Sequence, residues 1–429
     1  MLVATALSAF LVLGAAPAMA VPTTDRVSIS SAGAQGNNQS GLGAPSKNGQ
    51  FVAFDSLASN LVPTDTNATQ DIFVRNRNSG KTTAVSRRSN GAEANGASAG
   101  AQISDSGRWV GFTSNATNLV ALDGNAVSDA FVHDRDTKKT TRVSTRSNGG
   151  EANGSSTLQG ISGNGRFVVF TSNATNLVPG DSNGVTDVFV KNRKSGKTTR
   201  VSLRSNGAQG NQASFSAAIS PNARYVTFTS AASNLVPNDS NGVSDIFVHD
   251  RNNKNTRRVS VASNGAQANQ ASQLSDVSDN GVIVFASFAT NLVPGDTNGF
   301  WDAFAHRISN GETRRVSVSS AGLQGNNHSG IFGVPTISAN GDRIAFDSLA
   351  SNLVAGDSNA NLDTFLRDRS SQTTRRVSVR FDGTQGNTAA AGGHVTSNGK
   401  LVAFISNSTN LVGGDSNGFV DTFIRGPIN

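Results

Sequence analysis

The sequence predicts an all-β fold, a seven-bladed β-propeller of four-stranded blades, from three observations. The tripeptide Asn-Leu-Val occurs seven times at spacings of 57 to 61 residues, which is typical of a repeat architecture. Each repeat contains four short strand-forming runs and no helical periodicity. A Val-Ser strand motif also occurs seven times, once before the first Asn-Leu-Val and not after the last. We therefore expect an N-terminal outer strand, about Asp25 to Ser30, to complete the last blade and close the ring.

The third repeat shows the order of the expected strands. The first ends near Ile161, the second covers 167–171, the third covers 187–190 and the fourth covers 198–202. The connection between the second and third strands is long and carries both Asn-Leu-Val and an Asp-Ser-Asn-Gly run. Most of the 23 Phe residues fall at fixed places in the repeat, which is enough apolar volume for a layered core.

The first 20 residues form an apolar segment ending in Ala18-Met19-Ala20, the pattern of a cleaved secretory signal peptide. A membrane anchor is the weaker alternative, because the apolar run is interrupted and barely long enough to span a bilayer. Residues 21–429 are expected to form one propeller domain, secreted or held in the periplasm or cell envelope, without a membrane-spanning segment in the mature chain. The chain has no Cys, which excludes disulfides and thiolate chemistry.

The net charge of +7 is predicted to be divided between two faces of the ring. Loops rich in Asp and Asn should form an acidic face, whereas residues such as Arg166 and Lys191 should form a basic one. A nucleic-acid-binding protein would interleave basic residues with exposed aromatic ones, and that pattern is absent, so nucleic acid is not expected as a partner. His133, His249 and His306 stand where other repeats have Lys or Arg, which predicts solvated positions.

The motif Asp-x-Asn-x-x-x-Asp occurs in all seven repeats, just before the third strand. Two carboxylates and an amide oxygen could hold a hard cation such as Ca²⁺, completed by carbonyls and water. The alternative is an Asx-turn, in which the side chains bind their own backbone. The residue after Asn is Ala in three copies, which suggests that the backbone freedom of glycine is not required there. The candidate ligands are Asp65, Asn67, Asp71, Asp123, Asn125, Asp129, Asp181, Asn183, Asp187, Asp239, Asn241, Asp245, Asp296, Asn298, Asp302, Asp357, Asn359, Asp363, Asp415, Asn417 and Asp421.

Candidate ligand-binding residues are those at which the repeats differ. The fifth repeat has Phe300 and Trp301 in this loop, and the seventh has Phe419, where other repeats carry small residues. Exposed aromatic rings there could stack on a sugar or anchor a protein partner, or they could pack on a neighbouring blade. The sixth repeat carries an insertion around 331–335, which we expect at the mouth of the central channel.

The run Ser-x-x-Gly-Arg-x-Val-x-Phe at 104–112 and 162–170, followed by Asp-x-Phe-Val, resembles the TolB-like, WD-like propeller repeat. That repeat carries Ser-Pro-Asp-Gly before its second strand, to which Ser220-Pro221-Asn222-Ala223 is similar. The resemblance covers residues 24–426, although the repeats here are longer and the separate N-terminal domain of TolB is missing. It implies the propeller fold and an envelope-associated binding role, and it transfers no catalytic residue.

The expected function is that of an exported, non-enzymatic binding or scaffold module, monomeric, with a protein or cell-envelope glycan as partner. No nucleophile motif, phosphate loop or His cluster indicates catalysis, so no catalytic residue is assigned. The alternative is a glycan-active hydrolase or lyase in the central channel, which an unpaired carboxylate cluster there would support. Ca²⁺ is the only cofactor that the sequence suggests.

Overall fold

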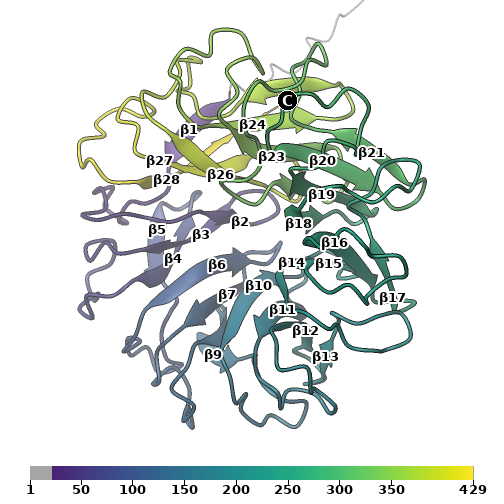
Figure 1. The fold of residues 1–429 in the computed structure, drawn as a ribbon. Helices are drawn as coiled ribbons and strands as arrows, with labels where there is room; N and C mark the ends of the chain where they lie inside the picture. Colours follow the sequence, from purple (N-terminus) through teal and green to yellow (C-terminus); the bar gives the residue numbers. More distant parts are fainter. Residues whose placement is uncertain (1–21, 429) are drawn as a thin grey trace, which may run out of the picture.

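The computed structural model describes residues 22–428 as a ring of seven four-stranded antiparallel sheets around a central channel (Figure 1). The predicted all-β propeller is confirmed, whereas the predicted signal peptide lies outside the described residues. Within residues 22–428 there is no apolar helix of membrane-spanning length. We number the blades in chain order and name the strands of each blade, from the channel outwards, inner, second, third and outer.

The strands follow the same order in every blade. Blade 1 comprises β2 (Ala44–Pro45), β3 (Phe51–Ser56), β4 (Asp71–Asn76) and β5 (Lys81–Ala84), and blade 2 comprises β6 (Ser98–Ile103), β7 (Trp109–Ser114), β8 (Asp129–Asp134) and β9 (Lys139–Arg142). Blade 3 comprises β10 (Ser156–Ile161), β11 (Phe167–Ser172), β12 (Asp187–Asn192) and β13 (Thr198–Arg200), and blade 4 comprises β14 (Ser214–Ile219), β15 (Tyr225–Ser230), β16 (Asp245–Asp250) and β17 (Asn255–Arg258). Blade 5 comprises β18 (Ser272–Val277), β19 (Val282–Ser287), β20 (Asp302–Arg307) and β21 (Glu312–Arg315), and blade 6 comprises β22 (Thr336–Ile337), β23 (Arg343–Ser348), β24 (Asp363–Asp368) and β25 (Thr373–Arg376). Blade 7 comprises β26 (Ala390–Val395), β27 (Val402–Ser406), β28 (Asp421–Gly426) and β1 (Thr23–Arg26).

The ring closes where β1 pairs with β28, as the sequence predicts. Thr23 lies opposite Gly426, and Arg26 lies opposite Phe423. Figure 1 shows this purple strand beside the yellow strands of blade 7. The strand begins and ends earlier in the chain than predicted, because the next residue, Val27, turns out of the ladder after its N–H donates to the carbonyl of Thr422 at 2.8 Å.

The apolar core lies between neighbouring blades, in seven separate clusters. In each blade a Phe of the second strand stacks on a Phe of the third, with ring centroids 5.6–6.0 Å apart. Such a pair contributes about 0.5–1.5 kcal/mol beyond the area that it buries. The pairs are Phe54–Phe73, Phe112–Phe131, Phe170–Phe189, Phe228–Phe247, Phe285–Phe304, Phe346–Phe365 and Phe404–Phe423. They explain why the sequence keeps Phe at fixed places.

The Asn-Leu-Val repeat has a structural role, shown by blade 3. Leu177 is 2% exposed and packs in the core. The side chain of Asn176 donates to the carbonyl of Glu151 at 3.0 Å, and its Oδ1 accepts the N–H of Asn153 at 3.0 Å. The Oδ1 of Asn153 in turn accepts the N–H of Thr175 at 2.9 Å. These bonds fix the long connection to the segment that enters the same blade.

Candidate functional site

In the Asp-x-Asn loop of blade 3, an arginine of the outer strand lies between the two aspartates. Nη1 of Arg200 is 2.9 Å from Oδ1 of Asp181 and 3.1 Å from Oδ2 of Asp187. The hydroxyl of Ser202 donates to Oδ1 of Asp187 at 2.5 Å. The two carboxylates are buried, with side chains 3% and 1% exposed. The guanidinium therefore offsets their charge inside the protein, where an unpaired carboxylate would be strongly disfavoured.

The asparagine of this loop joins blade 3 to blade 4. Nδ2 of Asn183 donates to Oδ2 of Asp187 at 3.0 Å and to the carbonyl of Gly210, in the segment that enters blade 4, at 3.0 Å. Its Oδ1 accepts the N–H of Val185 at 3.4 Å, the bond of an Asx-turn. The loop thus combines the local turn considered from the sequence with an inter-blade bond that the sequence did not reveal.

Six of the seven loops share the arginine, which we call the loop arginine. It contacts both aspartates at N–O distances of 2.9–3.6 Å. The loop arginines are Arg26, Arg142, Arg200, Arg258, Arg315 and Arg376, and blade 1 has Ala84 at this position. The aspartate side chains that they contact are 0–6% exposed. The predicted acidic face is therefore wrong for these carboxylates, because they are buried and paired.

One group of three carboxylates among residues 22–428 has its oxygens close enough together to hold a metal ion. Oxygens of Asp123, Asp129 and Glu151 lie within 4.8 Å of one another. Arg142 lies among them, with Nη1 at 3.1 Å from each aspartate and 2.5 Å from Glu151. A metal ion could enter this group only if the guanidinium moved away.

The backbone after the loop asparagine is left-handed in all seven copies. φ is 54–56° at Ala68, Ala126 and Ala360, and 68–71° at the four glycines. Because an L-residue is disfavoured in this region by about 1–2 kcal/mol, glycine is the less strained residue there. The positive φ of an Asn-Gly turn is therefore present in every copy, and three alanines adopt it at a cost in backbone strain.

The predicted aromatic residues of blade 5 belong to a cluster of four rings on the loop face. Trp301 lies against Phe288 with ring centroids 5.8 Å apart, and Phe300 meets His328 edge-on at 4.7 Å. The N–H of Trp301 also donates to Nδ1 of His328 at 3.1 Å. Phe288, which sequence reasoning missed, is 37% exposed. Phe419 is equally exposed on the loop of blade 7 and has no ring contact within the described residues.

The central channel is lined by the inner strands of all seven blades and encloses about 330 Å³. Both carboxylate oxygens of Asp276 accept backbone N–H groups, from Val277 at 2.8 Å and Ile337 at 2.9 Å, and burial raises the pKa of Asp276 to about 6. His394 lines the same channel, and burial lowers its pKa to about 4. Val334 of the inserted segment lines the same cavity, as expected. The described residues of the channel wall contain no cluster of three carboxylates or imidazoles.

Asp347 of β23 is a buried carboxyl beside the channel, 1% exposed, and burial raises its pKa to about 7. In the unfolded chain its pKa is near 3.8, so between these two values only the folded state keeps the proton. Its contribution to stability is therefore present below the lower pKa and is lost as the pH rises through the higher one.

Replacing Asp347 with Thr, the residue at this place in blades 2 to 4, is expected to raise the melting temperature at neutral pH. The variant should also lose the contribution of Asp347 to the pH dependence between pH 4 and 7, because no carboxyl remains at this position to be ionised. Scanning calorimetry of both proteins at a series of pH values measures this. Identical pH profiles would contradict the assignment.

The prediction that the third-strand histidines are solvated was wrong. His133, His249 and His306 are 6–7% exposed, and each Nδ1 lies 2.9–3.0 Å from a threonine hydroxyl of the outer strand. Burial lowers their pKa values to about 4. Lys191, at the same position in blade 3, is 6% exposed and donates to the carbonyl of Thr145 in blade 2 at 3.1 Å. The side chain at the end of each third strand faces the preceding blade. The sequence alone could not show this contact, because the preceding blade is distant in the chain.

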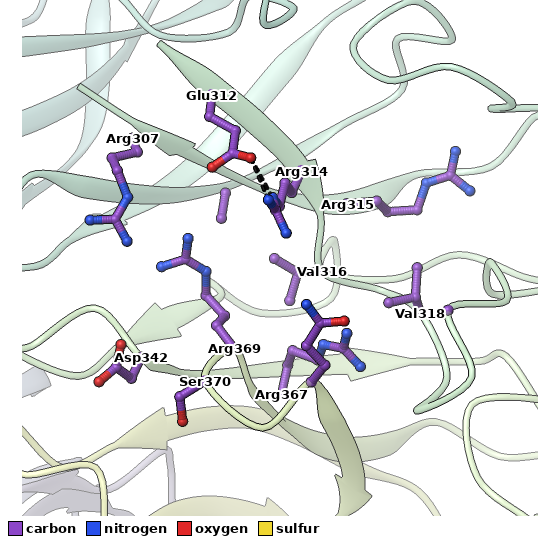
Figure 2. Close-up of a pocket in the computed structure, with 13 residues that line it drawn as sticks. Arg307, Glu312, Arg314, Arg315, Val316, Val318, Asp342, Arg367, Arg369 and Ser370 are labelled. Carbon is purple, nitrogen blue, oxygen red and sulfur yellow. Dashed lines mark hydrogen bonds and ion pairs between the residues drawn. The ribbon is translucent and has the colours of Figure 1, made fainter. Parts of the chain in front are cut away.

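A groove of about 500 Å³ between blades 5 and 6 is lined by arginines (Figure 2). Arg307 lies at the end of β20, Arg314 on β21 and Arg369 just after β24. Glu312 pairs with Arg314 at 2.5 Å, the contact dashed in Figure 2. Arg307 stands where blades 2, 4 and 6 have an aspartate. Five arginines line this groove against two carboxylates, Glu312 and Asp342, so the groove suits an anionic ligand.

No protein-family model matches the chain, and neither does any curated protein sequence. Solved structures share its fold. An oligogalacturonate lyase in complex with manganese is 11% identical, over 95% of this chain and 91% of that one, with a TM-score of 0.53. A prolyl endopeptidase is 10% identical, over 91% of this chain and 50% of that one, with a TM-score of 0.53. A TolB protein from Agrobacterium tumefaciens is 14% identical, over 81% of this chain and 94% of that one, with a TM-score of 0.42.

The same architecture occurs in a lyase and in an endopeptidase. At 10–14% identity the likeness extends to the fold alone.

Proposed function

We propose that the protein is an exported, monomeric, non-enzymatic binding module that acts at the cell envelope or outside the cell, and that its partner is a glycan. The aromatic cluster of blade 5 supports this proposal. The seven Phe pairs lie in the core, whereas Phe288 and Trp301 lie together on a loop surface. Aromatic rings offer the apolar faces of sugars a flat stacking surface, and the Asn and Gln side chains of neighbouring loops supply hydrogen bonds.

The charge of the protein favours an acidic glycan. The formal net charge is +7, and the groove between blades 5 and 6 presents Arg307, Arg314 and Arg369. Guanidinium groups bind carboxylate and phosphate with two parallel hydrogen bonds, and a positive surface speeds the approach of an anionic polymer. The partner class is therefore a glycan that carries carboxylate or phosphate groups.

The test replaces Phe300 with Val and Trp301 with Ser, which gives blade 5 the residues of the corresponding loop of blade 4, Val243 and Ser244. Because blade 4 folds with these residues, the variant should keep its melting temperature. Isothermal calorimetry against neutral, amino-sugar and uronic-acid oligosaccharides should show binding by the native protein, preferentially to the acidic ones. We expect the variant to bind at least about tenfold more weakly, since a central aromatic contact contributes about 1.5 kcal/mol or more.

Two controls locate the binding surface. Phe419→Ala removes an exposed ring of another blade and tests whether this predicted residue takes part. Arg307→Glu tests the groove and should weaken binding of acidic oligosaccharides only. Equal affinities of the blade 5 variant and the native protein would contradict the assignment of the aromatic cluster.

A glycan-active hydrolase or lyase with its site in the channel is the second candidate. Asp276 and His394 in the channel wall, with pKa values near 6 and 4, are its possible acid–base groups. Incubation of the same oligosaccharides with the protein, followed by an assay for new reducing ends, distinguishes cleavage from binding. Calcium at the Asp-x-Asn loops is compatible with either function, and the loop arginines lead us to restrict it to blade 1.

A further inference from the structure

Among residues 22–428, the Asp-x-Asn loop of blade 1 is the only one without a loop arginine. Ala84 lies opposite Phe73 in the pairing of β5 with β4, just as Arg142 lies opposite Phe131 in blade 2. The strand register is therefore unchanged, and only the side chain differs. A methyl group cannot reach the carboxylates of Asp65 and Asp71, so the space between them lacks the cation that the other six blades supply from their own outer strand.

A second substitution makes the same loop more negative. The substituted position lies in the segment that leads from the outer strand of one blade to the next blade. It is Glu93 after blade 1 and Glu151 after blade 2, whereas the other five blades have Gln there. In blade 3 two aspartates and Arg200 give the loop a formal charge of −1, whereas two aspartates and Glu93 give −3 in blade 1.

Arg87 offsets part of this negative charge, although it does not lie between the two aspartates as a loop arginine does. Its Nη2 donates to the carbonyl of Thr64 at 2.9 Å and pairs with Glu93 at 3.4 Å. Within residues 22–428 it forms no ion pair with Asp65 or Asp71. With Arg87 included, the loop keeps a formal charge of −2.

Two buried side-chain oxygens of this loop, from Asp65 and Thr69, have no hydrogen-bond partner. Oδ1 of Asp65 is buried and accepts no hydrogen bond. In the six other blades the corresponding Oδ1 binds the loop arginine at 2.9–3.1 Å. Burial, followed by the charges of Asp71 and Glu93, raises the pKa of Asp65 to about 6. Asp71 is 5% exposed, and its Oδ1 already accepts the hydroxyl of Ser86 at 2.5 Å.

We propose that the loop of blade 1 binds one divalent cation, with calcium the best match, at the place where the loop arginine lies in the other six blades. Oδ1 of Asp65 and Oδ2 of Asp71 are the charged ligands, and the carbonyl of Thr64 corresponds to the carbonyls that accept the arginine in blades 2, 3, 4 and 6. Carboxylate and carbonyl oxygens are the ligands that calcium prefers. A charge of +2 also balances the formal charge of the loop, which an arginine would only halve.

The experiment is calcium titration by isothermal calorimetry of the protein that begins at residue 21, after treatment with chelator. We expect one ion per chain and a higher melting temperature in calcium, because the ion binds the folded state. Ala84→Arg restores the pattern of the other blades and should abolish both effects while leaving the melting temperature in chelator unchanged or higher. Arg200→Ala should instead create a second site of the same kind in blade 3.

The results separate this site from the glycan-binding surface, which lies on blade 5. No calcium binding by the native protein, or equal binding by Ala84→Arg, would overturn the proposal. If Arg200→Ala does not fold, the native protein and Ala84→Arg still decide the question. A preference for Mg²⁺ that Ala84→Arg also abolishes would support the site and correct the choice of ion.

Discussion

A protein that begins at residue 31, without β1 and the four residues after it, is expected to lose ring closure. Blade 7 would then expose the edge of β28, Asp421 would lose its contacts with Arg26 and Ser28, and Val27 would leave the core. We expect a melting temperature lower by roughly 10 °C or more and self-association through the open edge. Calorimetry and size-exclusion chromatography with light scattering measure the two effects.

The matched control begins at residue 22 and keeps every described strand. It should remain monomeric and melt as a single transition. If the shorter protein melts at the same temperature as this control, the pairing of β1 with β28 does not contribute to stability, and the closure assigned to blade 7 is refuted.

Asp187→Ala is expected to lower the free energy of unfolding by about 3–5 kcal/mol, because it leaves the buried guanidinium of Arg200 with one partner fewer. It also removes the acceptor of Ser202. Asp71→Ala is the matched variant in blade 1, where no loop arginine is left behind. Its effect should be about 1–2 kcal/mol, from the bonds with Ser86 and Asn67.

Urea unfolding of the two variants, in chelator so that no bound metal contributes, tests this difference. A smaller loss for Asp71→Ala would show that the loop arginines make the aspartates indispensable in the other blades. Equal losses would mean that the ion pairs add nothing beyond the hydrogen bonds, and the structural role given to the arginines would have to be withdrawn.

The fold could be predicted because its signals repeat. Every blade carries the same Phe pair, the same buried Leu and the same turn residues. A sequence departure in one repeat therefore does not hide the strand pattern, which the other six repeats still show. The outer strand of blade 7 was predicted from the same count of motifs. The observed strand lies earlier in the chain than the predicted one. The repeated motif fixes the position of the Val-Ser pair, but it does not indicate the residue at which hydrogen bonding to β28 begins.

The candidate site was only half predicted, because its geometry depends on strand register. The sequence identified the aspartates, but Arg200 lies 13 residues after Asp187 and reaches it only because β13 folds back along β12. A signal was present: Arg precedes Val-Ser in six repeats and Ala84 does so in the other. The buried histidines were missed for the same reason, since the preceding blade that covers them is distant in the sequence.

The pairing of β1 with β28 also sets the order in which the molecule can fold. Blades 1 to 6 each form from a continuous segment, whereas Thr23 and Gly426 are separated by 403 residues. Contacts of such long range form slowly, since the chain entropy lost on bringing the ends together is not offset until they meet. Blades 1 to 6 can therefore assemble while the chain is still being synthesised. Blade 7 is completed last, and until then its third strand is the edge at which two molecules can pair.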